Sequence, residues 1–134
     1  MAADRDEIAA LVEVYRAGFA TLDAEKLQSI WDRDYETIYC PIELAAPIRG
    51  WPAIEQYYQR VTHHLIRAHF MEVANLSIDI LGDTAYAFLT FRFEGKVAGK
   101  SEPHKAEGRT TFIFRRKDDV WKGIHYHESA TGSY

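Results

Sequence analysis

A chain of 134 residues with 47% hydrophobic and 13% aromatic side chains can build one sizeable core, so residues 1–134 are predicted to form a single domain. The formal net charge is −4, and the charged residues are not concentrated in an acidic or a basic run. Neither nucleic acid nor a membrane surface is therefore an expected partner. No apolar run reaches the roughly 18 residues of a membrane span. The single cysteine, Cys40, excludes an intrachain disulfide and fits a reducing compartment, so a cytoplasmic location is expected.

Two amphipathic helices are predicted at the start of the chain. Asp4 followed by Glu7 has the form of a capping box, and apolar residues then recur at helical spacing up to Leu22. Asp23 has the residue type of an N-cap and predicts a short second helix that stops near residues 32–34. The first quarter of the chain is therefore predicted to be mostly helical.

A short strand and a loop separate the second helix from a third. Residues 36–40 alternate enough to form a strand, which Pro41 ends. The loop over residues 41–49 is a candidate lid, and its Glu43 is a candidate base, although a solvated loop carboxylate is the commoner case. The Gly-Trp-Pro sequence at residues 50–52 marks the start of the third helix, because proline is tolerated in a first turn.

The hydrophobic period changes from helical to two in the second half of the chain. The strands expected from this alternation are residues 70–80, 85–94, 109–116 and 120–129. Consecutive strands joined by turns pair in an antiparallel way, with one long polar loop over residues 95–105. The predicted fold class is α+β, with three N-terminal helices packed on a curved, mainly antiparallel sheet.

Alternation also assigns side chains to faces of the sheet. We predict that Arg92 points into the cone formed by the sheet, and that Glu128 of the last strand does the same. An unpaired charge in an apolar cavity is costly, so Arg92 and Glu128 are predicted to interact. Two interpretations of this pair stay open: a structural ion pair at the mouth, or a pair that orients a polar ligand.

The other predicted pocket residues share the inward parity or lie on the buried side of the third helix. They are Cys40, Tyr57, Tyr58, Tyr86, Phe88, Thr90, Thr110, Phe112, Phe114, Ile124 and Tyr126. Tyrosines in such places are more often aromatic core than proton donors, although a buried hydroxyl needs a partner. Cys40 has no evident base or cation beside it to make it a thiolate, and we interpret it as an apolar wall residue.

The opposite face of the sheet is predicted to be a dimer contact. His125, His127 and Trp121 share this face by alternation, and Phe91 points the same way from its own strand. A second apolar face left in water would be an exposed patch, so a homodimer through these residues is expected. Two histidines on one face also suggest a metal, but the dimer interpretation is favoured, and no metal or cofactor site is predicted.

The chain resembles the nuclear transport factor 2-like superfamily, in particular its SnoaL-like and ketosteroid-isomerase-like members. The resemblance rests on residues 38–41 (Ile-Tyr-Cys-Pro) leading to Gly50, and on Trp121 followed by residues 124–129. The C-terminal half is also similar to the association domain of calcium/calmodulin-dependent protein kinase II. The matching positions there are Gly82, Asp83, Arg92, Trp121, His125, His127 and Ser129. These resemblances imply a cystatin-like cone, which hosts both enzymes and non-catalytic modules.

The resemblance implies few of the known catalytic groups. Ketosteroid isomerases have a general-base aspartate just before the proline that closes the first strand, and Cys40 stands there. Their oxyanion tyrosine is matched by Tyr15, but Thr110 stands in place of their second oxyanion group. The kinase association domain is matched at Arg92, whereas its other pocket arginines fall at Phe112 and Glu128.

Two classes of function follow. The first is an isomerase, cyclase or dehydratase acting on a small, mostly apolar molecule, with Glu128 or Glu43 as base and with Arg92 and Tyr15 stabilising negative charge. The second is a non-catalytic homo-oligomerisation or ligand-binding module. Cys40 at the usual position of the base favours the second class, and the charges at Arg92 and Glu128 favour the first.

Overall fold

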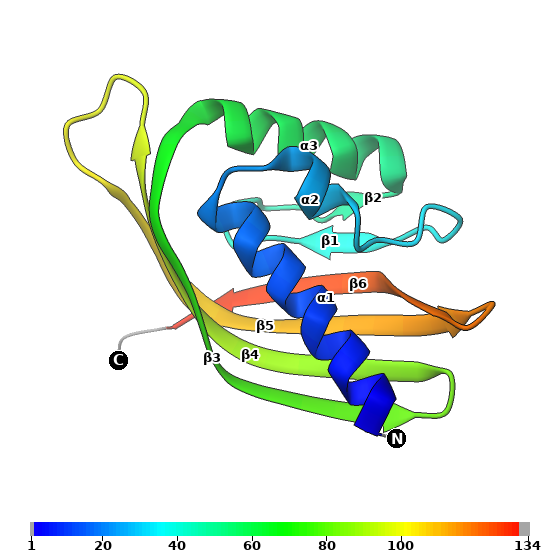
Figure 1. The fold of residues 1–134 in the computed structure, drawn as a ribbon. Helices are drawn as coiled ribbons and strands as arrows, with labels where there is room; N and C mark the ends of the chain where they lie inside the picture. The colour runs from blue at the N-terminus through cyan, green and yellow to red at the C-terminus, as the bar shows by residue number, and fades with distance from the viewer. Residues whose placement is uncertain (1, 132–134) are drawn as a thin grey trace.

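Three helices pack against one curved six-stranded sheet in the computed structural model, which describes residues 2–131 (Figure 1). The helices are α1 (Ala2–Ala20), α2 (Ala24–Gln28) and α3 (Trp51–His64). The strands are β1 (Ile38–Cys40), β2 (Ile48–Arg49), β3 (Leu65–Leu81), β4 (Thr84–Val97), β5 (His104–Lys117) and β6 (Val120–Ala130). The sheet order is β2-β1-β6-β5-β4-β3, and only the β1–β6 pair is parallel. The predicted α+β cone is confirmed.

The helices form where capping residues and apolar spacing predict them. Asp23 caps α2, since its side chain accepts the backbone N–H of Lys26 at 3.1 Å. Gly50 precedes α3 with φ of +80°, a conformation that glycine adopts without strain, and Pro52 lies in the first turn. The buried stripe of α3 includes Ile54, which is fully buried against the sheet.

Asp4 does not cap α1, and the predicted capping box is wrong. The helix begins at Ala2, so Asp4 lies inside its first turn. Its carboxylate accepts the indole N–H of Trp121 at 3.1 Å and pairs with the guanidinium of Arg116 at 3.1 Å. The Trp121 hydrogen bond and the Arg116 charge lower the pKa of Asp4. Asp4 therefore joins the start of the chain to its last hairpin.

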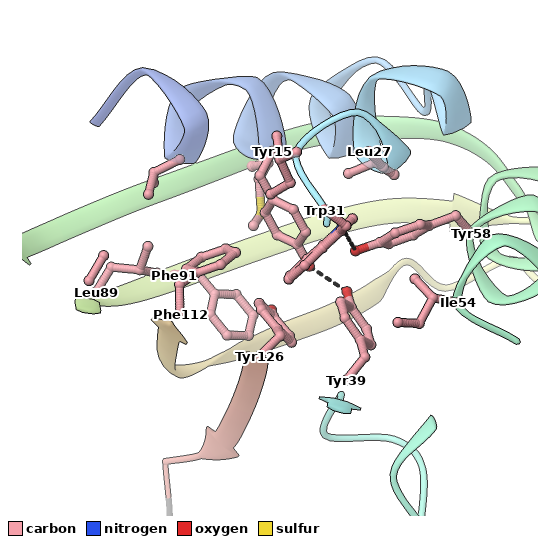
Figure 2. Close-up of a cluster of buried hydrophobic side chains, with 14 of the residues drawn as sticks. Tyr15, Leu27, Trp31, Tyr39, Ile54, Tyr58, Leu89, Phe91, Phe112 and Tyr126 are labelled. Carbon is pink, nitrogen blue, oxygen red and sulfur yellow. Dashed lines mark hydrogen bonds between the residues drawn. The ribbon is translucent and has the colours of Figure 1, made fainter. Parts of the chain in front are cut away.

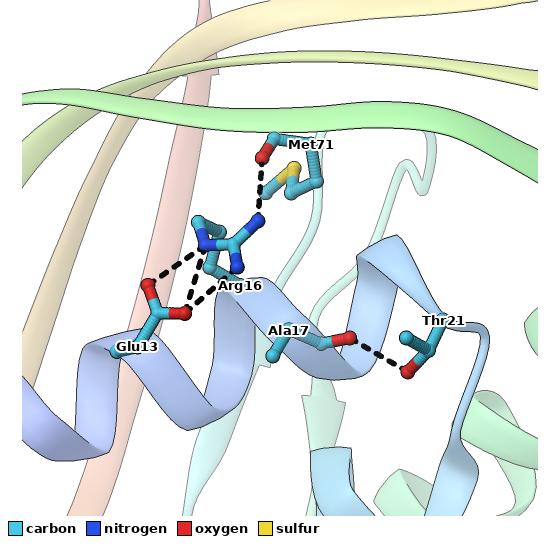
Figure 3. A network of polar contacts seen from close by, with 5 residues as sticks. All are labelled: Glu13, Arg16, Ala17, Thr21 and Met71. Carbon is cyan, nitrogen blue, oxygen red and sulfur yellow. Dashed lines mark hydrogen bonds and ion pairs between the residues drawn. The ribbon is translucent and has the colours of Figure 1, made fainter.

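A second polar contact holds α1 against the sheet. Arg16 pairs with Glu13 one turn earlier at 2.7 Å and donates to the backbone carbonyl of Met71 in β3 at 3.1 Å (Figure 3). The contact with β3 joins α1 to the longest strand of the sheet. Because Met71 is buried, this contact also fixes the backbone of a residue that faces the interior.

The side chains of β4 face the opposite way from the prediction. Its buried residues are Ala85, Ala87, Leu89, Phe91 and Phe93. The alternate set, Tyr86, Phe88, Thr90 and Arg92, lies on the outer face. Alternation divides a strand into two sets, but both sets here are largely apolar, so the pattern does not identify the set that meets the helices. The placements of these four residues in the pocket, and of Phe91 in the dimer contact, are wrong.

The predicted Arg92–Glu128 interaction is also wrong. The Arg92 side chain is 63% exposed and pairs with Glu72 at 3.3 Å and Glu107 at 3.7 Å. These partners lie on the strands that flank β4, at positions directly opposite Arg92. Cross-strand neighbours on a solvated face thus supply the counter-charges, and the burial cost that motivated the prediction does not arise.

A bulge in β6 reverses its alternation. Ile113 of β5 pairs with His125, but Phe114 pairs with Gly123, which leaves Ile124 as an extra residue. Beyond the bulge, His125 and His127 lie on the outer face, as predicted. Before it, Trp121 lies on the inner face and is 2% exposed. The placement of Trp121 in the dimer contact is therefore wrong, and Ile124 does not take a simple inward position.

The register of β1 places Tyr39 inside the cone and not Cys40. Tyr39 pairs with Tyr126 and is fully buried, and their rings stack with centroids 4.4 Å apart. Cys40 pairs with His127 and shares its outer face. The prediction of Cys40 as a pocket wall is wrong by one residue. The short strand β2 lies in the segment after Pro41 that was predicted to be a loop. Its two residues are too few to show the alternation by which a strand is recognised.

Aromatic side chains fill the interior of the cone (Figure 2). The buried cluster includes Tyr15, Trp31, Tyr39, Tyr58, Phe112, Phe114 and Tyr126. Its hydroxyls find partners within the cluster: Tyr15 and Tyr39 lie 2.5 Å apart at their hydroxyl oxygens, and the Trp31 indole N–H donates to Tyr58 at 3.1 Å. Burial raises the pKa of these tyrosines, so they stay protonated.

Across residues 2–131, none of the helices combines the length and apolar character that crossing a membrane requires.

Candidate functional site

A cavity of about 360 Å³ opens beside the aromatic core, where the loop between β1 and β2 meets α3 and the curved end of the sheet. Two helices, four strands and the β1–β2 loop contribute residues to its wall. The lining residues are Phe19, Ile42, Glu43, Tyr57, Val61, Leu65, Met71, Phe91, Phe93, His104, Lys105, Ala106, Glu107, Glu128 and Ala130. A volume of this size accommodates a small organic molecule.

Glu128 is the partly buried carboxyl group of this cavity. It lies on β6 opposite Thr110 of β5, with its side chain on the inner face. One carboxyl oxygen accepts the backbone N–H of Ile42 at 2.9 Å, and the other accepts the hydroxyl of Tyr126. Burial raises the pKa of Glu128 to about 7, a shift that these two hydrogen bonds oppose and the nearby charge of Glu43 reinforces. The group can therefore accept or release a proton near neutral pH.

Tyr126 supports Glu128 from the aromatic core. Its side chain is 1% exposed, and burial holds the pKa of its hydroxyl well above the ordinary value. The hydroxyl therefore stays protonated and donates to the carboxylate. The hydroxyl of Thr110, itself buried, lies 3.5 Å from that of Tyr126. These contacts hold the carboxyl in one orientation, because each of its oxygens has a fixed donor.

A second tyrosine and glutamate pair lies in the same cavity. Tyr57 of α3 is 4% exposed and donates its hydroxyl to Glu43 of the β1–β2 loop. Burial and the adjacent Glu43 raise the pKa of Tyr57 well above its ordinary value. Glu43 and Ile42 are neighbours in the loop, so the loop is attached both to α3 and, through the Ile42 N–H, to Glu128.

The predicted site residues fall into four groups. Glu128 and Tyr57 line the cavity. Tyr126 and Thr110 lie behind Glu128, whereas Tyr15, Tyr58, Phe112 and Phe114 belong to the packed core. The residues placed wrongly are Cys40, Tyr86, Phe88, Thr90, Arg92 and Ile124. Ile124 lies in the bulge and does not line this cavity.

Several cavity residues were not predicted. Phe19, Phe91 and Phe93 form much of the apolar wall, and His104 lies at the start of β5. The helical period places Phe19 on the buried side of α1, which is the one signal in the sequence that points to it. His104 has no such signal, because it falls in the predicted hairpin loop.

Among residues 2–131, no three histidine, cysteine, aspartate or glutamate side chains are grouped so that they could hold a metal ion.

The cone of three helices on a curved, mainly antiparallel sheet, with a cavity at its open end, is the nuclear transport factor 2-like fold. Within that class, the model of the SnoaL-like domain family matches residues 8–132, and the chain belongs to this family.

Known proteins of this fold differ in what they do. A crystal structure of a candidate dehydratase of the NTF2-like family from Streptomyces avermitilis superposes with a TM-score of 0.85 at 15% identity, covering 99% of this chain and all of that one. A candidate calcium/calmodulin-dependent protein kinase type II association domain from Thiobacillus denitrificans gives 0.76 at 18% identity, covering 92% and 94%.

A curated relative is the alpha chain of calcium/calmodulin-dependent protein kinase type II from Drosophila melanogaster. It is 22% identical over 129 residues, which is 96% of this chain. The chain spans 24% of the length of that kinase. These similarities show the fold, and the chemistry of this chain has to be argued from its own cavity.

Proposed function

We propose that the protein is an enzyme that removes a proton from a small, mostly apolar molecule, with Glu128 as general base. The observation that supports this proposal is a carboxyl group whose pKa is raised to about 7 and which faces an apolar cavity of about 360 Å³. A base with a pKa close to the working pH is present in its ionised form and still binds a proton strongly. Isomerisation of a ketone, aldol-type cyclisation and elimination of water next to a carbonyl group can each begin with such a step.

The cavity residues have separate roles in the proposed reaction. The carboxylate of Glu128 accepts a proton from a carbon next to an electron-withdrawing group of the substrate. The Tyr126 hydroxyl and the Ile42 N–H keep the carboxylate oriented before and after the transfer. Tyr57 is the hydroxyl donor on the α3 wall; its one hydrogen is bonded to Glu43, and it stabilises negative charge on a substrate oxygen when that oxygen takes the place of the Glu43 carboxylate. Arg92 and Tyr15, predicted for that task, do not line the cavity.

A base-sensitive probe tests this proposal without knowledge of the natural substrate. In 5-nitrobenzisoxazole, loss of the ring C–H proton to a base breaks the N–O bond and releases a coloured nitrophenolate. The wild-type protein is expected to accelerate this elimination about 100-fold or more over Glu128→Gln, in line with usual general-base contributions. The rate is expected to rise with pH through about 7.

A matched control is Glu25→Gln, which removes the same charge from an exposed position on α2 and is expected to keep the wild-type rate. Equal rates for wild type and Glu128→Gln would rule out Glu128 as the base.

The outer face of the sheet supports a second role, homodimerisation. Two rows of neighbouring residues cross this face: Ile38, His125, Ile113 and Tyr86 form one row, and Cys40, His127, Thr111 and Phe88 form the other. Tyr86 and Phe88 are 39% and 36% exposed. A patch of this kind is typical of an interface, and we propose that a second copy covers it.

A non-catalytic module is the alternative function. It is favoured by the similarity to the kinase type II chain and to the association domain, which extends over nearly all of this chain.

The two proposals for the outer face and the cavity are compatible, since the residues concerned lie on opposite faces of the sheet. The cytoplasmic location stays a prediction from the single cysteine.

A further inference from the structure

A second, wider cavity adjoins the first at its mouth. Its volume is about 650 Å³, and it shares Glu43, Tyr57, Val61, Leu65 and His104 with the inner cavity. Its other lining residues are Leu44, Arg60, His64, Val97, Lys100, Glu102 and Pro103. Because the two cavities share these wall residues, a molecule that reaches Glu128 and is longer than the inner cavity can extend into the outer one.

The two cavities differ in the chemistry of their walls. The inner cavity is lined mainly by aromatic and aliphatic side chains, with Glu128 as its partly buried carboxyl. The outer cavity has four basic side chains, Arg60, His64, Lys100 and His104, together with the carboxylates of Glu43 and Glu102. The basic groups come from the last turns of α3 and from the β4–β5 hairpin, so they approach the entrance from two sides.

Neither Arg60 nor Lys100 is engaged in an ion pair. Among the described residues, no carboxylate oxygen lies within 4 Å of a cationic nitrogen of either side chain. The two carboxylates of the outer cavity are Glu43, which accepts the Tyr57 hydroxyl, and Glu102, which is exposed in the hairpin loop. The backbone of Lys100 is held in the hairpin by Lys96, whose ammonium donates to the Lys100 carbonyl at 2.5 Å.

Arg60 is the basic residue best placed to act on a bound molecule. Its guanidinium lies over the Tyr57 ring, 6.0 Å from the centroid, and Tyr57 is part of the wall that the two cavities share. The planar guanidinium can hold a carboxylate or phosphate with two hydrogen bonds. Arg60 therefore stands at the boundary where an apolar substrate body would end and a polar head would begin.

We propose that the substrate is an amphipathic anion, with an apolar body in the inner cavity and a carboxylate or phosphate head held in the outer cavity by Arg60 and Lys100. This inference rests on the proposed function for the inner cavity, and it adds the class of substrate.

The test compares two probes that differ in charge and hardly in shape: 4-phenylbutanoate and its neutral amide, 4-phenylbutanamide. Binding of each is measured by calorimetry at low ionic strength. The wild-type protein is expected to bind the carboxylate about tenfold more tightly than the amide, as one charge-assisted contact allows. In the Arg60→Gln/Lys100→Gln double variant this ratio is expected to fall close to one.

The matched control is Arg49→Gln, which removes a positive charge from an exposed residue of β2 outside both cavities and is expected to keep the wild-type ratio. Equal binding of both probes by the wild type, binding of neither, or a preference that survives in the double variant would each overturn the inference. The neutral benzisoxazole probe reports on Glu128 alone, so failure of the proposed base and failure of the proposed anion site are distinguished by different measurements.

Discussion

Tyr126 donates its hydroxyl to Glu128 two residues further along the same strand, so an aromatic core residue and the cavity carboxyl form one unit on the inner face of β6. Residues two apart on a strand share a face, which is why this pair can form within a single strand. The β1–β2 loop completes the unit through the backbone N–H of Ile42.

The raised pKa of Glu128 predicts how stability depends on pH. Its ordinary pKa is 4.5, and in the folded protein it is raised to about 7. Between these values the folded protein keeps a proton that the unfolded chain has released, so the free energy of unfolding falls as pH rises through this window. The slope is about 1.4 kcal/mol per pH unit, for a total of at most about 3 kcal/mol, and it levels off above pH 7.

Urea unfolding at a series of pH values measures this slope. In Glu128→Gln the decrease between about pH 4.5 and 7 is expected to be reduced by that amount, because the titrating group is gone. The two proteins are compared by the slope of unfolding free energy against pH. Placing the glutamine amide between two donors adds a cost that does not change with pH, and such a cost leaves the slope unaffected. An identical slope in wild type and Glu128→Gln would contradict the raised pKa.

Tyr126→Phe is expected to raise the pKa of Glu128 further. The Tyr126 hydrogen bond stabilises the ionised carboxylate and therefore lowers its pKa against the effect of burial. Replacement by phenylalanine keeps the stacked ring against Tyr39 and removes only the hydroxyl. NMR titration of side-chain carboxyl carbons measures the change, and Tyr35→Phe, at an exposed tyrosine, is the matched control. A pKa that moves down would show that the hydroxyl does not donate to the ionised form.

Much of the fold could be predicted from the sequence because its signals are local. The cap at Asp23, the proline in the first turn of α3 and the alternation of β5 each depend on a few neighbouring residues. The inward positions of Thr110 and Phe112 followed from such alternation. These signals sufficed for the class of fold and for the order of its elements.

The site was harder to predict because it depends on long-range pairing. Alternation in β4 gave two apolar sets, and only the packing of the helices decides that Phe91 and not Arg92 faces inward. The bulge at Ile124 depends on the register between β5 and β6, which no local pattern reveals. The Glu43–Tyr57 pair brings a loop to a helix, and here too the sequence offers only the residue types.

Phe88→Glu is expected to convert a homodimer into a monomer. Phe88 lies on the outer face in the row with Thr111 and His127, and a carboxylate there would be buried in a self-complementary interface without a partner. Light scattering after size-exclusion chromatography measures the mass. Leu81→Glu, at a residue that is 65% exposed at the β3–β4 turn, is the control that should leave the mass unchanged. A wild-type protein that is already monomeric would contradict the proposed interface.

Gly108→Ala is expected to destabilise the protein by about 1–3 kcal/mol, the usual cost of forcing an extra methyl group into a packed interior. A methyl group on Gly108 would collide with the backbone carbonyl of Ser129, the residue after Glu128. Chemical denaturation measures the loss. Gly82→Asn is the control, since nothing lies near Gly82 and asparagine tolerates its positive φ of 66°. A variant as stable as the wild type would show that β5 and β6 can separate here at little cost.

The extra residue at Ile124 lets the length of this strand vary at one point without loss of the site. Ile124 has no partner in β5, so its deletion would leave the pairs of Gly123 with Phe114 and of His125 with Ile113 in place. The side chains downstream would keep their faces, with the imidazoles outside and the carboxyl and phenol inside. Homologues that lack this one residue would thus carry the same groups toward the cavity although their spacing from Trp121 differs, and alignments of this family have to place single-residue gaps at the bulge before a role is transferred from one member to another.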